Sequence, residues 1–146
     1  MTKIYTDGSC IGNPGKGGWA AIIIDNKKQK IISGSEPYTT NNRMELIAVI
    51  KALKNVKKRE INLITDSQYV KNGIEVWIFK WKKNGWMTAE KKPVKNKDLW
   101  LMLEKLSKDK KIKWEWVKGH SSNKLNNEVD RIAREQAESI GYNEKI

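Results

Sequence analysis

Residues 43–65, "RMELIAVIKALKNVKKREINLIT", decide the fold class of this 146-residue chain. Four apolar residues in the first half recur at the spacing of one helix face, at Leu46, Val49, Ile50 and Leu53. This spacing predicts a helix from about Arg43 to Lys54. The β-prone run Ile61–Thr65 follows it. A helix between two strands favours a crossover connection, so at least two strands are expected to be parallel.

Three short β-prone runs precede this helix, at residues 3–8, 18–25 and 29–35. The stretches that separate them, "GNPGKGG" and "DNKKQ", are rich in turn-forming residues. Short strands joined by such turns are typical of an antiparallel meander.

The C-terminal half continues the alternation of helices and strands. A short helical segment is predicted from Ser67, a helix at 97–106, a strand with period-two alternation at 112–117, and a helix at 125–140. We therefore predict an α/β fold with a five-stranded mixed sheet flanked by helices. No repeat or linker divides the chain, so residues 1–146 are expected to form one domain.

The composition indicates a soluble protein with a polyanionic partner. The net charge is +12, and the isoelectric point is near 9.7. Such a surface attracts phosphates, although a lysine-rich composition also serves solubility alone. No apolar stretch approaches the roughly 20 residues needed to cross a bilayer, and no secretory signal is visible at the N-terminus, so we expect no membrane contact and a cytoplasmic protein. Cys10 is the single cysteine and cannot form an internal disulfide.

Two aspartates stand where a ligand site is expected. Asp7 follows the run "KIYT", and Asp66 follows "INLIT". Each carboxylate is therefore delivered at the carboxyl end of a strand, the edge at which open α/β sheets bind ligands.

Two further acids lie on predicted helices, and each has a structural alternative. With Asn42 as the N-cap, Glu45 occupies the third helical position, where it would complete a capping box. Asp130 lies at the margin of the apolar face of the last helix, beside small alanines that leave it room to point inward. As a boundary residue it would instead pair with Arg131 or Arg134.

Convergence of Asp7, Glu45, Asp66 and Asp130 would require a cation. Two like charges 4 Å apart repel by about 4 kcal/mol at an effective dielectric constant near 20. Carboxylate oxygens without a cluster of His or Cys favour Mg²⁺ or Mn²⁺ over zinc. Two such ions together suit the hydrolysis of a phosphodiester.

Four blocks of the sequence resemble the motifs of bacterial ribonuclease HI, the type 1 ribonuclease H that cleaves the RNA strand of RNA–DNA hybrids. They are "YTDGSCIGNPGKGGWAAI", "TTNNRMEL", "ITDSQYV" and "KGHSSNKLNNEVDRIA". The resemblance covers essentially the whole chain, and each block carries one of the four acids.

The resemblance implies a role for each acid. Asp7 would bridge two metal ions, Asp130 would help to hold the one that activates the water, and Glu45 with Asp66 would hold the other. His120, the only histidine, would handle protons or product release, although a lone loop histidine is more often ordinary surface.

Residues 77–97 resemble the basic protrusion of the bacterial enzymes. Seven lysines stand there against one glutamate, with Trp77, Trp81 and Trp86 interleaved. Lysines track a phosphate backbone, and aromatic rings contact sugars or bases, although Trp81 is expected to be partly structural. The expected contacts to the substrate from this segment are Lys80, Lys82, Lys83, Lys91, Lys92 and Lys95.

The resemblance also implies contacts to each strand of the hybrid. Contacts in the minor groove are expected from Cys10, Asn13, Asn41, Asn42 and Gln68. The DNA strand is expected to meet Thr40 and Asn96 at a phosphate, and Trp77 and Trp100 in a channel. Read without the resemblance, Cys10 is only a small buried residue and the asparagine pair only a helix cap.

The sequence thus predicts a monomeric endoribonuclease acting on RNA–DNA hybrids with two Mg²⁺ ions, for which Mn²⁺ would substitute. Its products would carry 5′-phosphate and 3′-hydroxyl ends. The alternatives are a hybrid-binding module that does not cut, and another nuclease or an integrase-type enzyme on the same fold, because a fold alone does not select the chemistry.

Overall fold

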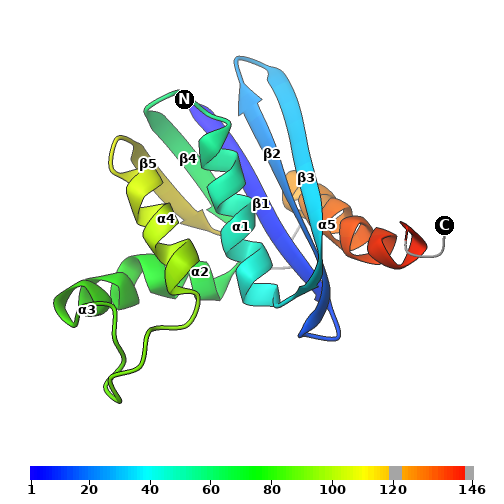
Figure 1. The fold of residues 1–146 in the computed structure, drawn as a ribbon. Coiled ribbons are helices and arrows are strands. Elements are labelled where there is room, and N and C mark those ends of the chain that lie inside the picture. Colours follow the sequence, from blue (N-terminus) through cyan, green and yellow to red (C-terminus); the bar gives the residue numbers. More distant parts are fainter. Residues whose placement is uncertain (119–122, 144–146) are drawn as a thin grey trace.

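The computed structural model describes residues 1–118 and 123–143 and contains one five-stranded mixed sheet (Figure 1). Its strands are β1 (Thr2–Ile11), β2 (Gly15–Asp25), β3 (Lys28–Thr39), β4 (Glu60–Thr65) and β5 (Lys111–Trp116), arranged in the order β3-β2-β1-β4-β5. β1, β2 and β3 pair antiparallel, whereas β4 is parallel to β1 and to β5. The predicted meander and parallel crossover are confirmed.

Helices cover both faces of this sheet (Figure 1). One face carries α1 (Asn41–Lys54), α2 (Gln68–Asn72), α3 (Ile78–Lys83) and α4 (Lys97–Ser107), and the other carries α5 (Lys124–Asn143). Alternation along β1 divides the core, because Ile4 packs on the α1 side and Tyr5 on the α5 side. No helix in the described ranges is long and apolar enough to cross a lipid bilayer.

The start of α1 differs from the prediction. The helix begins at Asn41, and Thr40 is its N-cap, accepting a hydrogen bond on its hydroxyl from the Arg43 backbone N–H (3.2 Å). Asn42 is therefore not the cap, and Glu45 has no part in a capping box. Both Thr40 and Asn42 are favourable cap residues, so their order in "TTNN" could not settle which one caps.

The helical segment after Ser67 is longer than predicted. Ser67 is the N-cap of α2, and helical turns continue from α2 through a π-helical stretch, Gly73–Trp77, into α3. Gly73 lies inside this helical run, and a side chain there would clash with the ring of Trp100. Its role is to let the helix approach α4 closely.

The strands β1, β2 and β3 also extend beyond the predicted bounds. β1 reaches Ile11, and β3 reaches Thr39. The added part of β3 is mostly exposed and polar, so hydrophobic alternation did not reveal it.

Candidate active site

The site forms where β1 and β4 separate. Their parallel pairing ends at Tyr5 and Ile64, after which β1 continues beyond the end of β4. Asp7 lies on this continuation, and Asp66 is the first residue after β4. Asp66 therefore stands at the carboxyl end of its strand, as expected, whereas Asp7 lies within β1, just past the residues that pair with β4. The opening between the two strands still brings both aspartates to the edge at which α/β sheets bind ligands.

Glu45 reaches this opening from α1. Its side chain is buried, and its Oε1 accepts a hydrogen bond from the Gly8 backbone N–H at 3.0 Å. Gly8 permits the contact, because a Cβ at this position would collide with the α1 backbone at Met44 and Glu45. The missing side chain lets helix and strand pack closely enough to bring Glu45 to the end of β4.

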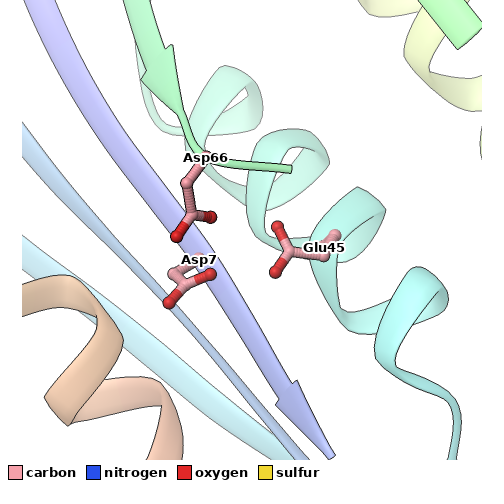
Figure 2. Close-up of side chains that lie close together, drawn as sticks. All are labelled: Asp7, Glu45 and Asp66. Carbon is pink, nitrogen blue, oxygen red and sulfur yellow. The ribbon is translucent and has the colours of Figure 1, made fainter. Parts of the chain in front are cut away.

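One carboxylate oxygen from each of Asp7, Glu45 and Asp66 lies within 4.8 Å of the others (Figure 2). Desolvation and then the charge of Glu45 raise the pKa of Asp7 to about 12. Burial likewise raises the pKa of Glu45 to about 8, and it raises the pKa of Asp66. In the free protein, protons must therefore relieve the repulsion between these groups.

The donor set suits a hard divalent cation. The cluster offers only carboxylate oxygens, and Glu45 Oε2 is buried with no hydrogen-bond partner among the described residues. An unpartnered oxygen that faces two other carboxylates is an expected metal ligand, because a cation would satisfy it and remove the repulsion together. The three residues therefore form a group able to hold a metal ion.

Asp130 approaches the cluster from α5. It is half-buried and lines, with the other three acids, a cavity of about 330 Å³. It acts as a hydrogen-bond partner of Asp7 and helps to raise the pKa of that carboxyl. Its Oδ2 also accepts a hydrogen bond from Arg134 Nε at 3.3 Å. Asp130 therefore both points toward the cluster and pairs with an arginine of its own helix, so the two alternatives are not exclusive.

Two residues that the sequence analysis missed support Asp66. Trp116 Nε1 donates a hydrogen bond to the Asp66 main-chain carbonyl (3.1 Å), while Lys71 Nζ lies 5.4 Å from the centre of the Trp116 ring. The buried Asn126 hydrogen-bonds the Asp66 carboxylate and lowers its pKa in part. The spacing of Asn126, one helical turn before Asp130, was the available signal.

The residues expected at the minor groove gather beside the carboxylates. Asn41, Asn42 and Gln68 line the same cavity. Asn13 Oδ1 accepts a hydrogen bond from the Asn41 backbone N–H at 3.0 Å, and Cys10 Sγ donates to the Thr39 carbonyl at 3.4 Å. Asn13 therefore orients the first residue of α1 toward the site.

Thr40 and Asn96 do not share a described hydrogen bond, but Arg43 links them. The Thr40 hydroxyl caps the Arg43 N–H, and Arg43 Nη1 donates to Asn96 Oδ1 at 3.2 Å. The same guanidinium forms a two-pronged ion pair with Asp98, which lowers the pKa of that aspartate. The Asn96 amide also donates to the Tyr69 hydroxyl (3.0 Å), so its orientation is set from both sides.

The aromatic residues divide into half-buried members and the fully buried Trp100. Trp77 is half-buried, and its ring centre lies 5.6 Å from that of Tyr69. Trp100 is fully buried and donates from Nε1 to the Tyr69 hydroxyl (3.0 Å), so the expected contact of Trp100 with a DNA strand is not supported. Trp100 instead supports Tyr69 from beneath. Trp81 packs between Trp77, Trp86 and Trp100, which confirms its structural role.

The lysines of residues 77–97 are mostly free for an external partner. Lys80, Lys83, Lys91 and Lys95 are exposed. Lys82 pairs with Glu104 at 2.8 Å, and Lys92 lies 4.0 Å from Glu90. His120 lies outside the described residues.

A protein-family model described as RNase H matches residues 1–138. The chain belongs to the ribonuclease H family. A protein named Ribonuclease H from Bradyrhizobium sp. (strain ORS 278) is 54% identical over 136 residues, which cover 92% of this chain and 88% of that protein. Ribonuclease H from Ehrlichia ruminantium (strain Gardel) is 56% identical over 134 residues, which cover 91% of this chain and 92% of that protein. These relatives support a ribonuclease H enzyme.

Solved ribonuclease H structures share the fold. LC9-RNase H1, a type 1 RNase H with the type 2 active-site motif, is 27% identical with a TM-score of 0.83, over 94% of this chain and 72% of that chain. LC11-RNase H1, solved with an RNA/DNA hybrid, is 20% identical with a TM-score of 0.73, over 96% of this chain and 99% of that chain. At 20% identity, the similarity to LC11-RNase H1 concerns the fold alone.

Proposed function

We propose that this ribonuclease H cleaves the RNA strand of RNA–DNA hybrids with two bound divalent ions, Mg²⁺ or Mn²⁺. The observation that carries the proposal is the cluster of three carboxylates within 4.8 Å, joined by Asp130 in one open cavity. Ionised carboxylates this close in a largely buried setting repel one another, and a bound divalent cation would remove that repulsion and use their oxygens as ligands.

Four acids would hold the ions, with Asp7 between them, Asp130 on one side, and Glu45 with Asp66 on the other. When bound, the ions would stabilise charge on the attacking and leaving oxygens of the phosphodiester and assist ionisation of the water. The chain itself contributes position: Gly8 holds Glu45, and Trp116 with Asn126 holds Asp66. His120 would carry a proton or assist product release. The expected products have 5′-phosphate and 3′-hydroxyl ends.

The surroundings of the cavity suit a hybrid. Neutral amides at Asn41, Asn42 and Gln68 can donate to and accept from 2′-hydroxyl groups, which only the RNA strand carries. The DNA strand would lie across Trp77 toward the phosphate contacts at Thr40 and Asn96. The exposed lysines of residues 77–97 would contact its backbone.

Cleavage of three labelled duplexes tests the proposal. Hybrid, double-stranded RNA and double-stranded DNA are incubated with the parent protein, with Asp7→Asn and with the control Asp109→Asn, in Mg²⁺ or in EDTA. We expect Mg²⁺-dependent cleavage of the hybrid alone, by the parent and the control only. Asp7→Asn should still bind the hybrid in an anisotropy measurement. Undiminished cleavage by Asp7→Asn would overturn the metal assignment, and cleavage of all three duplexes would overturn the substrate.

The chemical groups at the ends of the RNA cleavage products are tested in a separate experiment. A 3′-hydroxyl on the upstream RNA fragment allows a DNA polymerase to extend it, and a 5′-phosphate on the downstream fragment allows a ligase to join it. Failure of both reactions after complete cleavage would show that the scissile bond breaks on the other side of the phosphorus.

A further inference from the structure

The positive charge of the protein is concentrated at two opposite ends of the molecule. Residues 77–97 carry a net +6. Three other segments, 25–30, 54–60 and 107–111, carry ten lysine and arginine residues against three acids, a net +7. The remainder of the chain has a net charge of −1, so these two regions account for the whole excess.

The three segments meet at one end of the sheet, which we call the basic edge. They form the β2–β3 turn, the α1–β4 connection and the α4–β5 connection, all at the end of the sheet where the N-terminus lies (Figure 1). The register agrees, since Lys3 pairs with Ile24, Thr2 with Ile61, and Glu60 with Lys111. From Thr2 to Asp7 the strand rises about 17 Å, so the basic edge is separate from the carboxylates.

Hydrogen bonds hold the backbone of the basic edge in place. Lys110 Nζ donates to the carbonyls of Val56 (2.7 Å) and Lys58 (3.2 Å), and the Lys111 backbone N–H donates to the Arg59 carbonyl (2.7 Å). On the other side, Lys30 Nζ donates to Asn55 Oδ1 at 3.3 Å. The three segments are therefore joined into one surface.

A cavity of about 600 Å³ opens in the basic edge between the β2–β3 hairpin and the α1–β4 connection. Four lysines line it, at Lys28, Lys30, Lys57 and Lys58. Among the described residues, the ion pair at this lining is Lys58 with Asp25, at 4.0 Å. Most of the positive charge is thus available to an outside anion.

One polar residue is buried beside this cavity. Thr2 lines this cavity and a neighbouring one of about 430 Å³, and its side chain is 2% exposed. The Thr2 hydroxyl has no hydrogen-bond partner in the described part of the chain. This oxygen is almost completely inaccessible, so the lysines, and not Thr2, would recognise an anionic occupant.

We propose that the basic edge binds the phosphate backbone of a second nucleic-acid segment while the carboxylate site holds the first. The charge extends over three segments beyond the cavity, which suits a polyanion better than a single small phosphate. Because the basic edge lies at the end of the sheet opposite residues 77–97, a straight duplex bound across the carboxylates and those residues would leave the edge free. The protein would therefore bridge two segments. The choice of nucleic acid rests on the proposed function, although the charged surface does not.

A capture assay with two variants of equal charge tests the bridge. The edge variant carries Lys28→Gln, Lys30→Gln, Lys57→Gln and Lys58→Gln. The control variant carries the same change at the exposed Lys80, Lys83, Lys91 and Lys95. Both are made in the parent and in an Asp7→Asn background, which prevents cleavage, and their melting curves are compared to confirm folding. Protein bound to an immobilised short hybrid is then offered a labelled double-stranded DNA.

The edge variant is expected to lose capture of the second duplex at least tenfold, while kcat/KM on the short hybrid stays within twofold of the parent. Removing four phosphate contacts should lower the salt slope of capture by about 3 to 4. The control variant should cleave the hybrid more weakly but should capture as much of the second duplex per molecule of protein held on the hybrid, and capture is compared on that basis for both variants. Equal capture by the parent and the edge variant would overturn the proposal, as would an equal loss in both variants.

Two further measurements separate the possible outcomes. Inorganic phosphate or a mononucleotide that blocks the edge at micromolar concentration, with no capture of the duplex, would overturn the proposal in favour of a small anion. Direct binding of double-stranded DNA by the control variant measures the basic edge without reference to cleavage. Retained binding there would support the basic edge even if the protein failed to cut hybrids.

Discussion

Replacing Asp7 with asparagine is expected to stabilise the metal-free protein while it abolishes cleavage. The Asp7 side chain is 4% exposed, and oxygens of Glu45 and Asp66 lie within 4.8 Å of its carboxylate. Burial, followed by the charge of Glu45, raises its pKa to about 12 from 3.8. At neutral pH the folded protein must therefore keep a proton on Asp7 that the unfolded chain releases.

The size of the stabilisation expected for Asp7→Asn follows from this difference in bound protons. Between the unfolded and the folded pKa, stability falls as pH rises, because the folded state binds more protons. At pH 7.5 the cost is about 5 kcal/mol, and at pH 5 it is about 2 kcal/mol, because each pKa unit corresponds to about 1.4 kcal/mol. An asparagine amide removes this cost but leaves a buried polar group, at about 1–3 kcal/mol. The net gain expected at pH 7.5 is about 2–4 kcal/mol.

Urea unfolding followed by tryptophan fluorescence measures this gain. The parent, Asp7→Asn and Asp109→Asn are compared in EDTA at pH 7.5 and pH 5, and then in Mg²⁺ at pH 7.5. Asp109 is exposed on the α4–β5 connection, so its replacement should change stability by no more than about 0.5 kcal/mol. Mg²⁺ should stabilise the parent more than Asp7→Asn. The reasoning is refuted if Asp7→Asn is less stable than the parent at pH 7.5 in EDTA, or if its gain is equally large at pH 5.

Three other substitutions probe the supports of the site. Gly8→Ala should cost about 1–3 kcal/mol in thermal unfolding and reduce the cleavage rate, because the new Cβ would displace the helix that carries Glu45. Trp100→Ala should cost about 3–5 kcal/mol in urea unfolding, since the ring is fully buried; a cost below 1 kcal/mol would contradict its supporting role. Asp98→Asn should cost at most about 1 kcal/mol, because its pair with Arg43 is partly exposed. The same change should tighten hybrid binding in an anisotropy titration, by removing a carboxylate near the expected phosphate contact; weaker binding would contradict this.

The predicted elements were most accurate where the buried face was apolar. The stripe on α1 and the runs before Asp7 and Asp66 reveal their structure because each buries apolar side chains with the period of its backbone. Exposed polar residues of β3 carry no such signal, so the end of that strand was missed. The close packing of Gly73 against Trp100 was not predicted, because Trp100 lies far away in sequence.

The candidate site was predictable to the extent that strand order determines it. Asp7 and Asp66 meet at one edge because each lies just past the last paired residues of two adjacent parallel strands, but the inward turn of Glu45 depends on its contact with Gly8. The burial of Trp100 likewise depends on Tyr69 and Gly73. The basic edge escaped notice for the same reason, because the sheet register brings its three segments together across some 80 residues of sequence.

The separation of charges explains how an acidic site works in a basic protein. The basic edge lies about 17 Å along β1 from Asp7, beyond the Debye length of about 8 Å at physiological ionic strength. Its lysines therefore do little to offset the repulsion among the buried carboxylates, and within the described part of the chain Arg134 pairs with Asp130 at the margin of the cluster. Protons or metal ions must balance the cluster locally. It follows that moderate salt should weaken nucleic-acid binding steeply while it leaves the affinity for the metal much less changed, because the two interactions depend on separate groups of charges.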